Sequence, residues 1–279
     1  TRYARAATRC FDYVLRDMTT HEGAFYTAED ADNLDANGKR EEGEFYVWTP
    51  EQTRRALNEK AGFAIAALGL EESPTLEAGP VAHLRPGASV DFAALDPLLD
   101  QLRIARDARN RPIRDEKVIA GWNGLMIRAL AEGGAALDRP DYIAAAARAF
   151  DNALARLSDD STLARIEAGG ERREEAGLED HAWLGLAALS LFDATHETKW
   201  LSAAQTQASE LAAFDHRNAM KMTRTDGPLG PVSDTDDGAV PSGPSSALEF
   251  LARLDARAPD PAQRDRAQRL LAALSGAVV

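Results

Sequence analysis

Acidic and aromatic residues that could bind a sugar gather near the expected starts of three helices. In RDEKVIAGWNG and GLEDHAW, carboxylates stand close to a tryptophan, and DDGAVPSG adds two aspartates. Carboxylates accept hydrogen bonds from hydroxyl groups, and aromatic rings stack on the C–H faces of sugars. Two carboxyl groups in different environments can also act as general acid and general base. These residue types indicate a site for a carbohydrate or a similar polyol.

The candidates for catalysis are Asp180, His181 and Asp237. Asp180 and His181 lie in the first turn of an expected helix, and imidazole transfers protons readily near neutral pH. Both residues could instead have a purely structural role. A carboxylate in the first turn stabilises the positive end of the helix dipole, and a buried histidine can be hydrogen-bonded and packed on Trp183. The expected ligand-binding residues are Glu29, Asp30, Asp32, Trp48, Lys117, Trp122, Asn123, Glu179 and Ser242.

We expect neither a metal nor a cofactor. The single cysteine, Cys10, excludes an internal disulfide and a Cys-rich metal site, and its place on a helical apolar stripe predicts a core thiol. No Gly-rich phosphate loop precedes a helix. Residues 33–44 match the oxygen-ligand spacing of a calcium loop. However, Asn33 at the first position and Arg40 at the apolar eighth position favour a solvated hairpin tip.

Composition excludes several classes of partner. The formal net charge of −13 would repel nucleic-acid phosphates and anionic membranes. No apolar run approaches the roughly twenty residues that span a bilayer, and no signal peptide is visible. With 44% apolar residues, the chain of 279 residues can bury a substantial core. We therefore expect a cytoplasmic protein that binds a small molecule, with neither nucleic acid nor membrane as a partner.

Paired helical segments, repeated about every sixty residues, must position these side chains. Apolar residues at helical spacing cover 118–138 with 140–157, 178–197 with 199–214, and 242–257 with 261–274. Connections within a pair are short, whereas 158–177 and 215–241 are long and polar. The long connections share one end of the stack, here called the mouth, where function is expected. The pattern favours a closed ring of helical hairpins, with an open α-solenoid as the alternative.

The N-terminal part of the chain mixes helices and strands. Residues 2–18 carry a helical apolar stripe, and two aromatic runs around a turn-rich segment predict a β-hairpin over 23–48. Thr49 with Gln52 forms a capping-box pattern for a helix that runs to about residue 70. A strand is expected at 81–84, and a helix at 91–110 whose regular part begins at Pro97. Short strands are also expected at 162–168 and 219–225.

Four blocks in a fixed order resemble a known family. They are GAFYTAEDAD…EEGEFYVWTPEQ, RPIRDEKVIAGWNGLMIRALA, GLEDHAWLGLAAL and DDGAVPSGPSSA, and the match runs over residues 11–253. In these blocks the chain resembles the spermatogenesis-associated thioredoxin-domain proteins. The resemblance implies an (α/α)6 toroid similar to those of N-acylglucosamine 2-epimerases and six-hairpin glycosidases. The thioredoxin-like domain of that family is absent from this chain, whose one cysteine could not form a paired-cysteine motif.

The family motifs extend to Glu42, Gly43, Pro241 and Gly243. Two positions depart from the family pattern. His181 stands where the family usually has tyrosine, so a catalytic imidazole would be particular to this chain. Pro244 stands where the family usually has asparagine, which removes a hydrogen-bonding side chain from the mouth.

The sequence thus predicts a single domain over residues 1–279. Its expected fold is an all-α (α/α)6 toroid, incomplete at both ends, with short β-hairpins at the mouth. The expected function is the binding of a carbohydrate or polyol, with sugar isomerisation, epimerisation or glycoside hydrolysis as the reaction if the mouth carboxylates are catalytic. The alternative is a non-catalytic binding or scaffold toroid that partners a thioredoxin-like domain.

Overall fold

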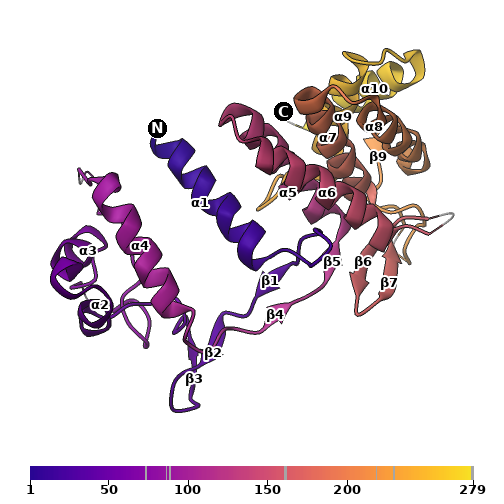
Figure 1. Ribbon diagram of the computed structural model, residues 1–279. Helices are drawn as coiled ribbons and strands as arrows, with labels where there is room; N and C mark the ends of the chain where they lie inside the picture. The colour runs from indigo at the N-terminus through magenta and orange to yellow at the C-terminus, as the bar shows by residue number, and fades with distance from the viewer. Residues whose placement is uncertain are drawn as a thin grey trace. The chain divides into compact units, whose positions relative to one another are not determined.

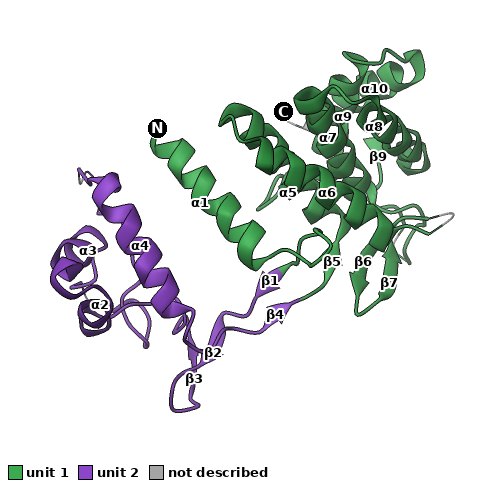
Figure 2. Cartoon of the chain, viewed as in Figure 1, with its two compact units in different colours: residues 1–27, 116–279 green, residues 28–115 purple. Residues whose placement is uncertain are grey.

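The computed structural model describes residues 1–72, 74–85, 87, 89–159, 162–217, 219–228 and 230–277 (Figure 1). They form two compact units, shown in Figure 2: unit 1 comprises Thr1–Thr27 with Glu116–Val279, and unit 2 comprises Ala28–Asp115. Helices are the main regular secondary structure of both units, accompanied by short antiparallel strands, so the predicted class, all-α with short β-hairpins, is confirmed. The single domain over 1–279 stays a prediction.

The predicted helical pairs form the body of unit 1. α7 packs against both α5 and α9, while α6, α8 and α10 pack on α5, α7 and α9 respectively. The layer made by α5, α7 and α9 therefore contains the helices that follow the long connections. The bounds are α1 Arg2–Asp17, α5 Ala120–Ala136, α6 Pro140–Leu157, α7 Leu178–Thr195, α8 Thr198–Glu210 continued by the 3-10 helix η2 Leu211–Phe214, α9 Gly243–Asp255 and α10 Pro261–Ala277.

Glycines let the inner helices approach one another closely. A Cβ atom added at Gly124 of α5 would lie 2.7 Å from the carbonyl carbon of Trp183 and 2.8 Å from the backbone nitrogen of Leu184, both on α7. A Cβ atom added at Gly185 of α7 would overlap the ring of Phe250 on α9. The indole Nε1–H of Trp183 also donates to Ser246 Oγ of α9 at 2.8 Å. Close backbone approach thus supplies much of the contact between these helices.

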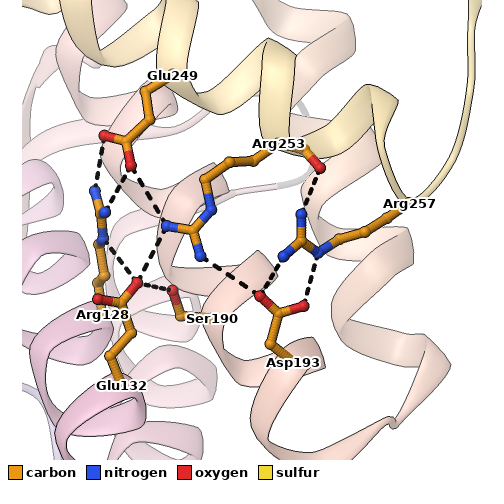
Figure 3. Close-up of polar contacts among 7 residues, drawn as sticks. All are labelled: Arg128, Glu132, Ser190, Asp193, Glu249, Arg253 and Arg257. Carbon is orange, nitrogen blue, oxygen red and sulfur yellow. Dashed lines mark hydrogen bonds and ion pairs between the residues drawn. The ribbon is translucent and has the colours of Figure 1, made fainter.

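A network of charges joins the same three helices (Figure 3). Arg128 of α5 pairs with Glu249 of α9 at 2.6 Å, and Glu132 of α5 accepts from Arg253 at 3.1 Å. Asp193 of α7 pairs with Arg253 at 3.5 Å and with Arg257, which follows α9. Ser190 Oγ of α7 donates to Glu132 at 2.8 Å. Among the residues drawn, every carboxylate accepts from at least one arginine, so each helix is linked to the other two.

Short strands accompany the connections of unit 1. β5 Val118–Ile119, β6 Ala164–Ala168 and β7 Glu171–Glu175 form an antiparallel sheet in that order, and β8 Asp215–His216 pairs with β9 Ala219–Met220. The strand predicted over 162–168 is confirmed, and the one predicted over 219–225 is confined to β9. No helix among the described residues combines the length and apolarity needed to cross a membrane.

Unit 2 combines two strand pairs with a small helical cluster. β1 Ala28–Glu29 pairs with β4 Arg114–Asp115, and β2 Asp32–Leu34 pairs with β3 Arg40–Glu42, both antiparallel. The helices are α2 Pro50–Leu57, the 3-10 helix η1 Asn58–Lys60, α3 Ala61–Ala67 and α4 Phe92–Arg106. The predicted capping box is present: Gln52 N donates to Thr49 Oγ1 at 3.2 Å, and Thr49 N donates to Gln52 Oε1 at 3.0 Å.

Several predicted details of the N-terminal half are wrong. The helix expected from 49 to 70 is broken at Asn58, whose φ of 52° ends α2. The strand expected over 81–84 is irregular. Pro97 lies inside α4 instead of starting its regular part, because the Asp91 carboxylate caps an earlier turn through Ala93 N at 3.0 Å. Cys10 is exposed, not a core thiol.

The hairpin predicted over 23–48 is present only in its central part. β2 and β3 pair with each other, whereas β1 pairs with β4 from a distant segment. At the tip, Asp35 Oδ1 accepts from Asn37 N and Lys39 N, each at 2.8 Å, as in an Asx turn. Asn33 is buried and donates to Glu44 at 3.0 Å. Two residues of the calcium-loop pattern thus bond to each other.

Candidate functional site

Asp180 is buried at the start of α7, where it fastens three segments together. Its Oδ2 accepts from Gly177 N at 2.9 Å and from Arg165 Nη1 of β6 at 3.0 Å, and its Oδ1 accepts from Gly121 N of α5 at 2.9 Å. Burial raises the pKa of Asp180 above the ordinary value of an aspartate, and the Arg165 guanidinium and the two N–H groups partly offset this effect. These bonds engage both oxygens, and catalysis by Asp180 stays a prediction.

Glu179 shares the arginine of Asp180. Its Oε1 accepts from Arg165 Nη2 at 2.5 Å, so one guanidinium serves two consecutive carboxylates at the start of α7. Arg165 is about one-third exposed on β6, the strand that pairs with the segment leading into α5. The single positive charge of Arg165 thus offsets one of the two negative charges at this helix end.

His181 is also buried, with both ring nitrogens near polar partners. Nδ1 lies 2.8 Å from Gln207 Oε1 of α8, and Nε2 lies 3.5 Å from Arg224 Nη2 in the connection before α9. Because the amide oxygen only accepts, Nδ1 carries the proton and Nε2 is the acceptor. Burial lowers the pKa of His181, so the ring is neutral near pH 7. A role as proton carrier stays a prediction.

The polar candidates at the start of α5 differ in exposure. Asn123 is buried, and its amide bonds both backbone groups of Phe25: Oδ1 accepts from Phe25 N at 2.8 Å and Nδ2 donates to Phe25 O at 3.0 Å. The amide therefore anchors the chain that follows α1. Trp122 is 47% exposed. Lys117 is exposed and interacts with neighbouring groups.

Asp237 and Ser242 form the cap of α9. Ser242 Oγ accepts from Ser245 N at 3.3 Å, and Ser242 N donates to Asp237 Oδ1 at 2.8 Å. The hydrogen bond from Ser242 N lowers the pKa of Asp237, so this exposed carboxyl is ionised near neutral pH. Helix capping thus explains the geometry of both residues.

In unit 2, Glu29 and Trp48 are covered by other side chains. Glu29 accepts from the hydroxyl of Tyr46 and lies 3.7 Å from Arg111 Nε. Trp48 is 8% exposed, and the guanidinium of Arg109 lies 4.3 Å from its ring centroid. A sugar could not stack on this indole without displacing the arginine.

Asp30 and Asp32 line a pocket of about 400 Å³ beside the β2–β3 hairpin. Arg40 bridges them: Nη2 lies 2.8 Å from Asp30 Oδ2, and Nε lies 2.9 Å from Asp32 Oδ2. Leu34 and Ile113, which are 51% and 75% exposed, supply apolar surface. The lining consists of Asp30, Asp32, Asn33, Leu34, Arg40, Asn110, Arg111 and Ile113. Carboxylates, guanidinium groups, amides and apolar carbon therefore converge on one small-molecule-sized cavity.

The predicted site residues thus fall into two groups. Asp180 connects the starts of α7 and α5 in unit 1, and Glu179 and Asn123 bond to neighbouring segments of the same unit, whereas Asp30 and Asp32 belong to the pocket of unit 2. The sequence did not predict which arginines pair with these carboxylates. It also did not predict that Leu34 and Ile113 line the pocket. The signal available was local charge: most of these acids lie within about fifteen positions of an arginine that could neutralise them. Within the described ranges, no cluster of three or more His, Cys, Asp or Glu residues could hold a metal ion.

Comparison with known proteins places the chain beside one group of relatives. No family model matches. Spermatogenesis-associated protein 20 of Mus musculus is 30% identical over 301 residues, which cover 90% of this chain and 38% of that protein. The Rattus norvegicus protein of the same name is 29% identical over 302 residues, with the same coverage. The chain therefore spans 38% of the length of these relatives.

Solved structures with a partly similar fold carry the names of sugar enzymes. Cellobiose 2-epimerase from Spirochaeta thermophila has a TM-score of 0.47 at 13% identity, covering 99% of this chain and 71% of that one. An unsaturated glucuronyl hydrolase specific for heparin has a TM-score of 0.48 at 12% identity, covering 98% and 83%. The likeness concerns the fold alone. By sequence, the chain is a homologue of spermatogenesis-associated protein 20 over 90% of its length.

Proposed function

We propose that this chain binds a sugar or similar polyol in the pocket beside the β2–β3 hairpin. The observation that supports it is the composition of the cavity: two carboxylates, two arginines and two asparagines surround the exposed side chains of Leu34 and Ile113. A volume of about 400 Å³ lies within the range of roughly 300–1,000 Å³ that is typical of small-molecule sites.

The chemistry of the lining suits a polyhydroxylated ring. Asp30 and Asp32 each use Oδ2 for Arg40, and a carboxylate has about four lone-pair positions, so acceptor capacity remains for hydroxyl groups. The arginines and the Asn110 amide can donate to hydroxyl oxygens, whereas the Asn33 Nδ2 group is already bonded to Glu44 and to the backbone carbonyls of Leu34 and Asn110. Ile113 and Leu34 would lie against C–H groups, which a sugar presents on the faces of its ring.

Removing the apolar wall should weaken ligand binding without affecting the fold. We expect Ile113→Ser to raise the Kd of a bound sugar about fivefold, roughly 1 kcal/mol, because it removes one partly buried contact. The melting temperature should not change, since Ile113 is 75% exposed. Isothermal titration calorimetry with a panel of monosaccharides and disaccharides measures the effect.

The matched control is Ile104→Ser on α4, which removes an isoleucine that is 63% exposed in the same unit but outside the pocket. It should leave the Kd unchanged. Asp32→Asn should raise the Kd about tenfold by weakening the acceptor. The proposal is wrong if no sugar in the panel binds, or if both pocket variants bind as tightly as the parent chain.

A second candidate function is a non-catalytic scaffold that holds a thioredoxin-like domain. The observation in its favour is that Glu179 and Asp180 are both paired with Arg165, which leaves them occupied by the fold. Sedimentation of this chain with a separately produced thioredoxin-like domain of a relative tests it. A complex with a Kd below about 10 μM supports the scaffold, and co-sedimentation no greater than with an unrelated thioredoxin excludes it.

A further inference from the structure

The segment 221–226, here called the strap, lies against the starts of α7 and α9. Met222 O accepts from Leu178 N, the first residue of α7, at 3.0 Å. The side chain of Met222 borders Gly243, the first residue of α9. Two strap amides are themselves hydrogen-bonded: Lys221 N donates to Phe214 O at 2.9 Å, and Met222 N donates to Val232 O at 2.8 Å. The strap thus covers the helix ends that carry Glu179, Asp180 and Ser242.

One arginine connects the strap to the body of unit 1. Arg224 Nε lies 2.9 Å from Glu175 Oε1 of β7, and its Nη2 pairs with Glu210 of α8. The same Nη2 lies 3.5 Å from His181 Nε2, and the guanidinium carbon lies 5.3 Å from the ring centroid of Phe214. Arg224 therefore adds two ion pairs, one aromatic contact and one contact with a histidine to the backbone hydrogen bonds of the strap.

The contact between Arg224 and His181 depends on the protonation state of the ring. His181 is 2% exposed, and its Nδ1–H is committed to Gln207 at 2.8 Å. Only a neutral ring offers Nε2 as an acceptor to the guanidinium. A second proton would replace that acceptor with a donor and place two cations 3.5 Å apart in a buried site.

We propose that His181 and Arg224 form an acid-sensitive latch, which holds the strap against the starts of α7 and α9 near neutral pH and releases it when His181 is protonated. This latch is independent of the pocket in unit 2, because all of its residues belong to unit 1. It assigns to His181 a positioning role exerted through Arg224.

The direction of the pH effect follows from the groups around the ring. Burial and the Arg224 charge lower the pKa of His181, whereas Gln207, Glu210 and Glu175 oppose the change. The latched state therefore binds fewer protons than the released state. The contribution of His181 to the stability of the latched state is fully present above the ordinary histidine pKa of about 6.5. This contribution decreases as the pH falls from there towards the lowered pKa.

Hydrogen exchange of the strap amides tests the latch. We expect the protection of Lys221 N and Met222 N, corrected for the intrinsic exchange rate, to fall between about pH 7.5 and pH 5.5. Each pH unit inside the titration window changes the ratio of latched to released chain by up to about tenfold. Nuclear magnetic resonance of the His181 ring in the same samples shows whether protonation of His181 coincides with the loss of amide protection in the strap.

Variants separate the latch from a general response to acid. His181→Gln keeps an uncharged acceptor for Arg224 but cannot titrate, so strap protection should become independent of pH. Arg224→Gln removes the ion pairs and should lower protection at both pH values. The control His196→Asn alters an exposed histidine at the other end of α7 and should keep the full response. Persistence of the pH response in His181→Gln overturns the latch, as does unchanged protection in the parent chain down to about pH 5.5.

Discussion

Gly124→Ala is expected to destabilise unit 1 by about 3 kcal/mol or more. The added Cβ would lie 2.7 Å from the Trp183 carbonyl carbon and 2.8 Å from the Leu184 nitrogen, so it meets the backbone of α7. Backbone atoms cannot rotate away as a side chain does, and α5 would have to move from its partner. Chemical denaturation monitored by circular dichroism measures the loss of stability.

The same substitution at Gly62 should have the opposite sign. A Cβ atom at Gly62 of α3 would have no neighbour within 4 Å, and alanine favours a helix by about 0.5–1 kcal/mol relative to glycine. Gly62→Ala is therefore expected to stabilise its helix slightly. Equal effects of the two substitutions would show that close packing of α5 on α7 does not limit stability.

Asp180→Asn is expected to lower the stability of unit 1 by about 3 kcal/mol. The carboxylate accepts from Gly177 N, Gly121 N and Arg165, and an asparagine amide would turn one acceptor into a donor. Whichever way the amide points, its NH₂ group would face an N–H group, and Arg165 would lose the charge it pairs with. A role in helix capping alone would predict no loss, because asparagine caps a helix about as well as aspartate.

Glu179→Gln is the matched control for this substitution. Glu179 is half-buried and accepts from Arg165 through one oxygen, so a glutamine oxygen can replace the bond at a cost below about 1 kcal/mol. Thermal unfolding of the two variants gives the comparison. If Asp180→Asn has the same melting temperature as the parent chain, the hydrogen bonds of Asp180 to Gly121, Gly177 and Arg165 do not stabilise unit 1.

The helical pairs of unit 1 were predictable because they depend on local rules. Apolar residues at helical spacing located α5 to α10, and Ser242 and Thr49 act as N-caps as their side chains suggest. The helix break at Asn58 was not predicted, because a residue other than glycine with a positive φ angle is only weakly indicated by the sequence. The start of α4 was placed at Pro97 because proline is common in the first turn of helices, whereas Asp91 caps the helix at an earlier position.

The site was predictable by residue type but not by arrangement. Acidic residues near helix starts were located, yet Arg165, the partner of Asp180, lies on β6, whose pairing with β5 the sequence did not specify. The pocket joins Leu34 to Ile113 across a long stretch of chain, and no spacing rule connects such distant residues. Exposure of Trp122 and burial of Trp48 likewise depend on tertiary packing, which composition does not encode.

The charges along α9 also determine how that helix can align with its neighbours. Sliding α9 by one turn, about 5.4 Å, would move Phe250 away from Gly185 and would also exchange the ion pairs along the helix. Glu249, Arg253 and Arg257 follow one another at intervals of four residues, opposite Arg128, Glu132 and Asp193. A slip in one direction would bring Glu249 to the acids that now bind Arg253, and a slip in the other would bring Arg253 to Arg128. Either shift places like charges next to each other. The order of acidic and basic residues along α9 therefore favours the observed alignment over both shifted ones.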